Sequence, residues 1–234
     1  MTGDRPGSRL YGEYYQKHGS ARNDLLENPE VMFQTFAVDR ANITALQKLD
    51  LDRTHARVLD VGCGNGGSLL QFMRLGFKPS NLVGIDTSDE RIAQAAEFLP
   101  GVGFRKESAD ALPFGDSEFD LVFESTMLGT LESPTLLENI AREMLRVTKT
   151  RGYIMLADWR YSREGSGVRT AISPALIAKM FSVGKATRVV ARERGALVPP
   201  IGRRLSRITP SLYFLTQKLF PPAVGQITTV LQKL

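Results

Sequence analysis

The sequence has little of the residues from which disulfides and metal centres are built. Cys63 is its one cysteine, and His18 and His55 are its two histidines. A single cysteine excludes an intrachain disulfide and a cysteine-rich metal site, and such usage is typical of a reducing compartment. No obvious trio of carboxylates is spaced to hold a divalent cation, so we expect no bound metal. We therefore expect a cytoplasmic protein in which Cys63 is a small residue inside a crowded loop.

Long hydrophobic runs are also missing. The first residues, MTGDRPGSRLYGEYYQ, mix charges of both signs and contain no apolar core of the length that a secretory signal needs. The most apolar late stretch, residues 211–225, is interrupted by Gln217, Lys218 and two prolines. It falls well short of the roughly 20 apolar residues that span a bilayer. We expect neither an export signal nor an ordinary membrane span.

The composition is that of one folded domain with a substantial core. The 234 residues are 42% hydrophobic and 24% charged, which argues against a wholly disordered chain. The formal net charge of +5 is an excess that attracts nucleic acid, anionic lipid or an acidic substrate. Charge alone does not separate these partners.

Short apolar runs rich in β-branched residues alternate with helical segments. Strands separated by helices at intervals of about 25 residues favour βαβ crossovers and an open, doubly wound sheet with helices on both faces. Ligands then bind at the carboxyl ends of the parallel strands. We expect parallel strands at residues 57–61, 81–86, 102–108, 119–125 and 153–158, and two antiparallel edge strands at 186–194 and 226–233.

Helix starts are marked by an oxygen-bearing residue followed by proline, a pair suited to the first helical turn. A further start is predicted by a capping box, in which Thr87 and Glu90 satisfy opposite backbone donors. We therefore expect five helices with marked starts, the first of them an extra N-terminal helix before the sheet. The four proline-marked starts are Asn28-Pro29, Ser133-Pro134, Ser173-Pro174 and Thr209-Pro210.

The segment LDVGCGNGGS, residues 59–68, satisfies two glycine spacings. Gly62, Gly64 and Gly66 give G-x-G-x-G, whereas Gly67 in place of Gly66 gives the G-x-G-x-x-G pattern of dinucleotide-binding loops. Both patterns let the backbone turn tightly and approach a ligand closely. The glycines by themselves leave the ligand open.

Two carboxylates near these glycines favour a cationic nucleoside. Asp60 precedes Gly62 by two residues, where a pyrophosphate would be repelled but the sulfonium and ammonium groups of S-adenosylmethionine would be attracted. Asp86 ends the next predicted strand, where a carboxylate can accept hydrogen bonds from ribose hydroxyls in either cofactor class. The charge of Asp60 therefore favours S-adenosylmethionine over a dinucleotide.

Four segments in order resemble the class I S-adenosylmethionine-dependent methyltransferases, over roughly residues 57–160. They are VLDVGCGNGG (58–67), GIDTSDERI (84–92), ESADALPFGDSEFDLVFES (107–125) and REMLRVTKTRGYIMLADWR (142–160). The resemblance implies a Rossmann-like, mostly parallel seven-stranded sheet and S-adenosylmethionine as the cofactor. One departure is the turn Lys149-Thr150-Arg151-Gly152, where the family usually has Lys-Pro-Gly-Gly.

The resemblance also implies the cofactor contacts. Asp60 would lie near the methionine end, Asp86 would bind the ribose, and Asp110 would accept from the adenine amine. Glu124 would line the cofactor or acceptor pocket, and Asp110 has the alternative of being an ordinary loop residue, as has Asp116. The residues expected to contact the cofactor are Asp60, Gly62, Cys63, Gly64, Asp86, Thr87, Asp110, Ala111 and Glu124.

Methyl transfer needs alignment of the reactants, and a base only when the acceptor carries a proton at neutral pH. His18, beside three tyrosines, is one candidate base, with a solvated or structural histidine as its alternative. Asp158, which ends the strand at 153–158, is the other if burial raises its pKa. Its alternative is a carboxylate paired with Arg160 or Arg169. His55 lies at the opposite end of the sheet and is discounted.

The segment after the predicted strand at 119–125 lacks the Asn/Asp-Pro-Pro-aromatic run used to methylate planar amino groups. We therefore expect methylation on an oxygen of a small-molecule, glycan or lipid-linked acceptor. The alternatives are a protein that binds S-adenosylmethionine without catalysis and docks on membrane or RNA, and an NAD-dependent reductase. The latter is disfavoured because no Tyr-x-x-x-Lys pair follows that strand.

A basic segment follows. Residues 179–207 contain eight Lys and Arg but one acid, Glu193, and residues 197–222 interleave such charges with apolar side chains and prolines. This pattern indicates either a solvated rim or an acceptor-side cap that contacts the inner face of a membrane. Nucleic acid is disfavoured because no RNA-binding module is evident. We expect a single domain with an N-terminal lid and helix (1–50), a cofactor-binding core (51–160), and further strands with a basic cap (161–234).

Overall fold

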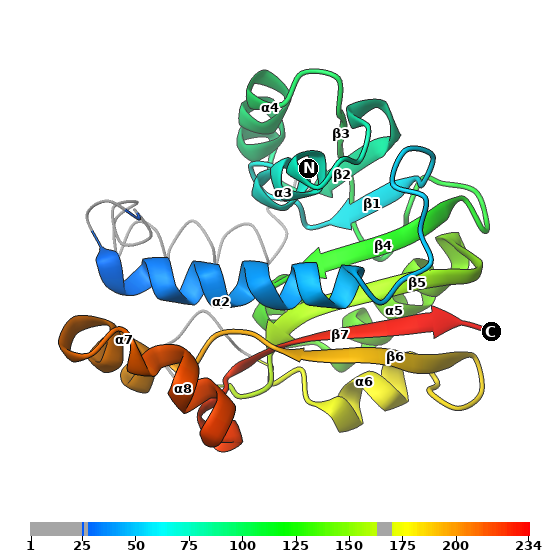
Figure 1. The fold of residues 1–234 in the computed structure, drawn as a ribbon. Helices are drawn as coiled ribbons and strands as arrows, with labels where there is room; N and C mark the ends of the chain where they lie inside the picture. The colour runs from blue at the N-terminus through cyan, green and yellow to red at the C-terminus, as the bar shows by residue number, and fades with distance from the viewer. Residues whose placement is uncertain (1–24, 26–27, 163–169) are drawn as a thin grey trace.

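The computed structural model describes residue 25, residues 28–162 and residues 170–234. Seven strands form one sheet in the order β3-β2-β1-β4-β5-β7-β6 (Figure 1). Strands from β3 to β5 run parallel, whereas β7 runs antiparallel to both β5 and β6. The strands are β1 (Val58–Val61), β2 (Leu82–Asp86), β3 (Gly103–Lys106), β4 (Phe119–Ser125), β5 (Thr148–Trp159), β6 (Thr187–Arg194) and β7 (Gln226–Lys233). The predicted mostly parallel, seven-stranded sheet is confirmed.

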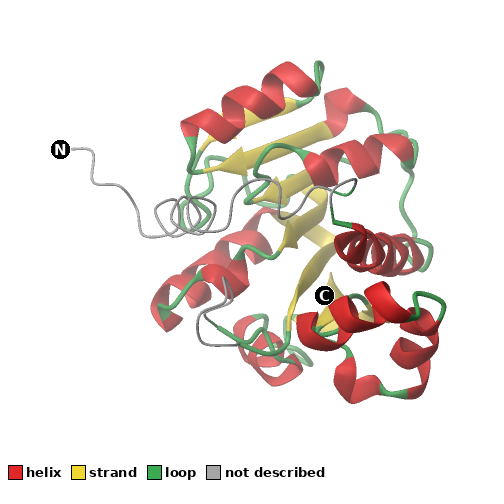
Figure 2. Cartoon of the chain, turned by 90° about the vertical axis from the view of Figure 1, so that its left-hand side faces the viewer, coloured by secondary structure: helices red, strands yellow, loops and turns green. Residues whose placement is uncertain are grey.

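Helices cover both faces of this sheet (Figure 2). The long helix α2 precedes β1, as expected of an extra N-terminal helix, and α7 and α8 lie between β6 and β7 in sequence. The helices are α2 (Pro29–Leu46), α3 (Gly67–Arg74), α4 (Asp89–Phe98), α5 (Pro134–Val147), α6 (Pro174–Met180), α7 (Pro199–Ile208) and α8 (Leu212–Leu219), with short 3-10 turns η2 (Pro79–Asn81), η3 (Leu128–Thr130) and η4 (Pro221–Ala223). No helix in the described part of the chain has the length and apolar character that crossing a bilayer requires.

The core lies in two layers, one on each face of the sheet. Because successive side chains of a strand point to opposite faces, Leu121 and Phe123 of β4 belong to one layer and Val122 to the other. Phe72 of α3 packs edge-on against Phe123, with ring centroids 5.4 Å apart. Met144 of α5 is buried in the opposite layer. Both faces of the central strands are therefore buried, which explains their continuous apolar sequence.

A smaller cluster joins α2 to the C-terminal cap. Ala37 of α2 is buried against Leu197, Tyr213 and Val224. The Tyr213 hydroxyl accepts a hydrogen bond from the Leu197 backbone N–H at 3.1 Å. The helices α7 and α8 lie at the end of the sheet toward which β1 and β4 point (Figure 1). The basic cap thus lies at the carboxyl end of the parallel strands, on the side where ligands of such sheets bind.

The predicted helix starts were correct at three of the four prolines. Ser133 and Ser173 accept from the backbone N–H groups of Leu136 and Leu176, and α2 begins at Pro29. The prediction at Thr209-Pro210 is wrong by two residues, because Thr209 is the C-cap of α7 and α8 begins at Leu212. The Thr87 capping box is wrong by one residue. Ser88 is the N-cap of α4, since its side chain accepts from the Arg91 N–H.

Candidate active site

Four carboxylates lie near the carboxyl ends of adjacent strands. Asp60 of β1 is in register with Gly84 of β2 and Phe123 of β4. Asp86 ends β2, Glu124 is the penultimate residue of β4, and Asp158 is the penultimate residue of β5. Because β2, β1, β4 and β5 are neighbours in the sheet, these side chains gather at one edge. This edge is where an open parallel sheet binds its ligands.

The glycine loop between β1 and α3 distinguishes the two spacings. Gly62, Gly64 and Gly66 adopt φ values of +76°, +55° and +86°, a left-handed region that strongly favours glycine. Gly67 starts α3 without a left-handed φ, and a Cβ on it would meet nothing within 4 Å. In a dinucleotide loop the third glycine permits close packing of helix on strand. The G-x-G-x-G set is therefore the one that the backbone requires.

Asp86 is fixed to this loop. Its Oδ2 accepts a hydrogen bond from the Gly64 N–H at 3.0 Å, and its Oδ1 accepts from the Ser88 N–H at 2.9 Å. Each oxygen retains a second lone pair for a ligand hydroxyl. The Asp86 carbonyl accepts from the Glu107 N–H at 3.0 Å, which brings the following loop alongside. In that loop Asp110 accepts from the Ser108 hydroxyl.

Asp60 is a buried acid with an unpartnered oxygen. Its side chain is 1% exposed, and Oδ2 has no hydrogen-bond partner within the described structure. Burial, with a further contribution from the charge of Asp86, raises the pKa of Asp60 to about 8. At neutral pH the cofactor-free carboxyl therefore carries a proton. The negative charge expected of Asp60 requires a compensating cation in this site.

Cys63 is buried as the sequence predicted. Its Sγ would lie 2.8 Å from a Cβ built on Gly84, so this thiol packs closely over β2. Burial raises the pKa of the Cys63 thiol, and the charges of Asp60 and Asp86 raise it further. The thiol is consequently protonated and unreactive. Thr87 directly follows Asp86, and Ala111 directly follows Asp110. Their contact with a cofactor stays a prediction.

Glu124 and Asp158 form a pair of buried carboxyl groups. Glu124 Oε2 accepts from the N–H groups of Met127 and Leu128 at 3.2 and 3.3 Å, while Oε1 has no partner within the described structure. Asp158 accepts from the N–H groups of Gly129 and Trp159 at 2.8 and 2.6 Å. Burial raises the pKa of Asp158 to about 7. Burial and then the charge of Asp158 raise the pKa of Glu124 well above its usual range, so the two carboxyl groups do not ionise independently.

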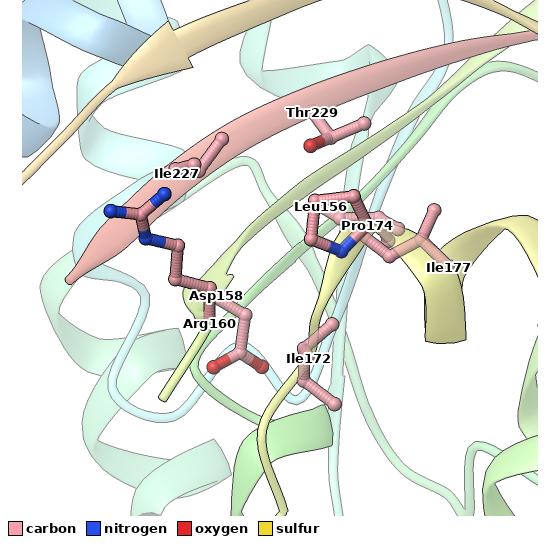
Figure 3. A pocket seen from close by; sticks show the side chains of 8 residues that line it. All are labelled: Leu156, Asp158, Arg160, Ile172, Pro174, Ile177, Ile227 and Thr229. Atoms are coloured by element: carbon pink, nitrogen blue, oxygen red, sulfur yellow. The ribbon is translucent and has the colours of Figure 1, made fainter. Parts of the chain in front are cut away.

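A small pocket opens beside Asp158 (Figure 3). The Asp158 carboxylate and the Arg160 guanidinium lie at one side of it, and Leu156, Pro174 and Ile177 at the other. Arg160 donates to the carbonyls of Val224 and Pro221, so backbone oxygens are its hydrogen-bond partners in the described structure. The pocket is lined by Leu156, Asp158, Arg160, Ile172, Pro174, Ile177, Ile227 and Thr229.

Sequence reasoning missed the turn after β4. Thr126 adopts φ +59°, and Met127 packs over the glycine loop, since a Cβ on Gly62 would lie 2.5 Å from its Cγ. The turn η3 then directs backbone N–H groups toward both Glu124 and Asp158. The only signal was the position of this segment, directly after a strand that carries an acid near its end. Such a position is where binding loops of these sheets lie.

His18 lies outside the described residues, as does Arg169. His55 pairs with Asp52 at 2.7 Å before β1, at the opposite end of the sheet, as expected. Within the described ranges, no group of three His, Cys, Asp or Glu side chains is placed to hold a metal ion.

The residues at the sheet edge fit S-adenosylmethionine. Among the described residues, the buried oxygens Asp60 Oδ2 and Glu124 Oε1 have no hydrogen-bond partner, which a cation or an ammonium N–H can supply. Asp86 retains acceptor capacity for ribose hydroxyls, and left-handed glycines keep Cβ atoms out of the loop. A dinucleotide would instead bring phosphate charge to a buried acid.

Comparisons with known proteins agree with this geometry. A family model described as a methyltransferase domain matches residues 52–191. Phthiotriol/phenolphthiotriol dimycocerosates methyltransferase 1 of Mycobacterium ulcerans (strain Agy99) is 28% identical over 148 residues, or 59% of this chain and 52% of that protein. The 2-methyl-6-phytyl-1,4-hydroquinone methyltransferase of Synechocystis sp. is 36% identical over 106 residues, or 44% of this chain and 31% of that protein. The matched region thus spans about half of the first relative and a third of the second.

A solved structure shows the same fold over nearly the whole chain. The PH0226 protein from Pyrococcus horikoshii OT3 matches with a TM-score of 0.62 and 18% identity, covering 95% of this chain and 99% of that one. The family model covers more than half of the 234 residues. The protein therefore belongs to the class I methyltransferases that use S-adenosylmethionine as their cofactor.

Proposed function

We propose that this methyltransferase methylates an oxygen atom of a small-molecule, glycan or lipid-linked acceptor by direct in-line transfer. The observation that carries the proposal is the Asp158 carboxyl group. It is buried, held by two backbone N–H groups, and faces a largely apolar pocket at the carboxyl edge of the sheet. A hydroxyl acceptor holds a proton at neutral pH and needs a group that removes it, and Asp158 is suited to that role.

S-adenosylmethionine would supply a methyl group bonded to a positively charged sulfur. The neutral thioether that remains after transfer is an excellent leaving group. Asp86, held by Gly64 and Ser88, would accept from the ribose hydroxyls. The buried oxygens of Asp60 and Glu124 would face the cationic methionine end, and Asp110 the adenine amine. These residues orient the cofactor and exclude water from it.

Asp158 would act on the acceptor. Bound S-adenosylmethionine would supply the methyl group and leave as neutral S-adenosylhomocysteine when its methyl carbon–sulfur bond breaks. The Asp158 carboxylate would take the proton of the acceptor hydroxyl whose oxygen forms the new bond to the methyl carbon. Glu124 would keep its own proton, because two neighbouring buried carboxyl groups resist ionising together. The backbone donors of Gly129 and Trp159 hold Asp158 in place and favour its ionised form. His18 stays a second candidate for the proton-accepting role.

The names of the relatives favour an apolar acceptor. One is a methyltransferase of phthiotriol and phenolphthiotriol dimycocerosates, and another of a phytyl hydroquinone. The pocket beside Asp158 has a volume of about 10 Å³, which admits little more than a hydroxyl group, and its apolar lining residues are Leu156, Ile172, Pro174, Ile177 and Ile227. A lipid-linked acceptor of this kind is held in a bilayer, and residues 197–222 are the segment that the sequence suggests for reaching it.

The proposal is tested with S-adenosylmethionine carrying a labelled methyl group. The protein is incubated with lipid, glycan and small-molecule fractions of its source, and the labelled product is analysed by mass spectrometry and NMR. We expect the label on an oxygen, at a rate that Asp158→Asn lowers by about 100-fold or more. The exposed Asp50→Asn serves as the matched control. Label on carbon or nitrogen contradicts the oxygen acceptor, and binding of cofactor without transfer to any fraction favours a non-catalytic protein.

A further inference from the structure

The outer face of α8 carries an exposed row of leucines. Leu212, Leu215 and Leu219 lie three and four residues apart and therefore share one side of the helix. The other side buries Tyr213 and Gln217 against the rest of the protein. We call the exposed set, with its neighbours at the ends of α7 and α8, the apolar row: Ile208, Leu212, Leu215, Leu219 and Phe220, which are between 41% and 70% exposed.

A groove with positively charged walls runs beside α8. It is formed by α2, β6 and α8 and has a volume of about 590 Å³. The one acid among the described residues that line it, Glu193, is paired with Lys48, which follows α2. The positive charges are therefore in excess, and the groove favours an anion. The charged residues that line this basic groove are Arg40, Arg192, Glu193, Arg194 and Lys218.

Side-chain contacts connect the elements that form the basic groove. Arg194 donates to the carbonyls of Gln217 and Lys218 at 3.2 and 2.8 Å, which satisfies the C-terminal end of α8. Arg40 donates to the Gln217 side chain and lies 5.1 Å from the centroid of the Phe214 ring. These contacts hold α8 against α2 and β6. Arg192 and Lys218 are exposed and lie at the groove.

The apolar row and the basic groove are continuous. Leu215 belongs to both, because it lies on the exposed side of α8 and also lines the groove. Lys218 lines the groove, and the next residue in the sequence is Leu219 of the apolar row. Aliphatic side chains next to cations match the boundary of a bilayer, where acyl chains meet anionic headgroups. RNA offers no comparable use for exposed leucines, since its bases stack on aromatic rings.

Hydrogen bonds of Arg160 connect the segment after α8 to the pocket beside Asp158. Arg160 lines that pocket and also donates to the carbonyls of Val224 and Pro221, in and after η4, the turn that follows α8. Both α7 and α8 lie at the carboxyl end of the parallel strands (Figure 1). A bilayer that meets the apolar row would therefore lie at the same end of the molecule as the active site.

We propose that the apolar row and the basic groove together form a surface that docks the protein on a bilayer containing anionic lipid, with leucines entering the headgroup region and the groove receiving a headgroup phosphate. The inference deepens the proposed function, because it assigns the route to a membrane-held acceptor. Its test is independent of methyl transfer, because binding to vesicles needs neither cofactor nor acceptor.

The experiment is co-sedimentation with vesicles of phosphatidylcholine, with and without phosphatidylglycerol. We expect the protein to bind the anionic vesicles and to be released at roughly 0.5 M salt, where charge interactions are screened. Arg192→Gln/Lys218→Gln should weaken binding by about tenfold or more. Leu215→Ser/Leu219→Ser should do the same without changing the charge.

Matched controls remove similar groups elsewhere. Phe98→Ser changes a side chain that is 62% exposed on α4, and Lys78→Gln/Lys185→Gln removes two exposed charges away from α8. Both controls should bind vesicles like the wild type, and all variants should unfold at the wild-type temperature. The proposal is overturned if the protein does not bind anionic vesicles, or if the control variants lose as much vesicle binding as the surface variants do. It is also overturned if the surface variants instead lose RNA binding or self-association while vesicle binding is absent.

Discussion

Glu124 and Asp158 share one turn of backbone, because three successive N–H groups in residues 127–129 serve the two carboxyl groups. Met127 and Leu128 donate to Glu124, and Gly129 donates to Asp158. The two acids come from neighbouring parallel strands, so the turn fixes both at the carboxyl edge of the sheet. Burial raises the pKa of both carboxyl groups, and the charge of Asp158 raises that of Glu124 further, so the pair resists losing both protons.

The reaction should therefore require the ionised form of Asp158. At saturating cofactor, kcat/KM for the acceptor should rise about tenfold per pH unit up to about pH 7, the raised pKa of Asp158, and level off above it. Asp158→Asn should remove this dependence and lower kcat/KM by about 100-fold or more. A pH–rate series on both proteins makes the comparison. An unchanged profile in the variant would remove Asp158 from the reaction.

Gly129 provides a second test of the same geometry. A Cβ at this position would lie 2.6 Å from Asp158 Oδ1, so Gly129→Ala must displace the carboxylate. We expect methyl transfer to fall by about tenfold or more while cofactor binding is retained, because a small misplacement of reacting groups is costly. Titration calorimetry and a transfer assay measure the two effects. Loss of both activities in equal proportion would mean that the turn serves the cofactor instead.

The glycine loop predicts opposite outcomes at adjacent positions. Gly66→Ala places a Cβ 2.8 Å from Leu99 Cδ1 at φ +86°, and should destabilise the fold by about 2 kcal/mol. Gly67→Ala meets nothing within 4 Å at the start of α3, and should be neutral or slightly stabilising. Urea denaturation of both variants gives the comparison. Equal destabilisation would indicate that both glycines are required, as in a dinucleotide loop.

Arg151 stands where the family usually has glycine, and the structure shows its consequence. Its φ is +64°, a left-handed conformation that costs an L-residue about 1–2 kcal/mol. Its backbone carbonyl accepts from the Gln232 side chain, an interaction that glycine would keep. Arg151→Gly should therefore raise the free energy of unfolding by about 1 kcal/mol. A lower midpoint of urea denaturation in the variant would show that the arginine side chain contributes more than its strain costs.

The sequence was most informative where periodicity and chemistry coincide. The strands at 119–125 and 226–233 were predicted with their observed bounds, because apolar runs between turn residues leave little choice. Helix α7 was missed because it starts at Val198-Pro199, without an oxygen-bearing cap. The strand predicted at 153–158 is longer in the structure, since β5 extends back through Arg151 to Thr148, where Thr148 pairs with Phe119.

The site could be predicted only in part. Asp60, Asp86, Glu124 and Asp158 were predicted because each lies at or near the end of an apolar run, and parallel strands bring such ends together. Their protonation could not be predicted, because the pKa of each acid depends on burial and on neighbours brought close by folding. The role of the Met127–Gly129 turn and the continuity of the groove with the leucines of α8 depend on contacts that no local pattern encodes.

The most direct test concerns Asp60, whose buried carboxyl holds a proton where a cation is expected. Burial raises the pKa of Asp60 to about 8. The protonated carboxyl therefore contributes fully to the free energy of unfolding below the ordinary pKa of an aspartate, and this contribution is lost as the pH rises through about 8. Binding of S-adenosylmethionine should favour the ionised form and release nearly one proton per molecule at pH 7.

Titration calorimetry at pH 7 in two buffers of different ionisation enthalpy measures that proton. We predict binding of S-adenosylmethionine with release of close to one proton in the wild type and none in Asp60→Asn, and weaker binding in Asp86→Ala. Binding that releases no proton from the wild type, or tight binding of NADH in place of S-adenosylmethionine, would contradict the assignment of these carboxylates to a cationic nucleoside.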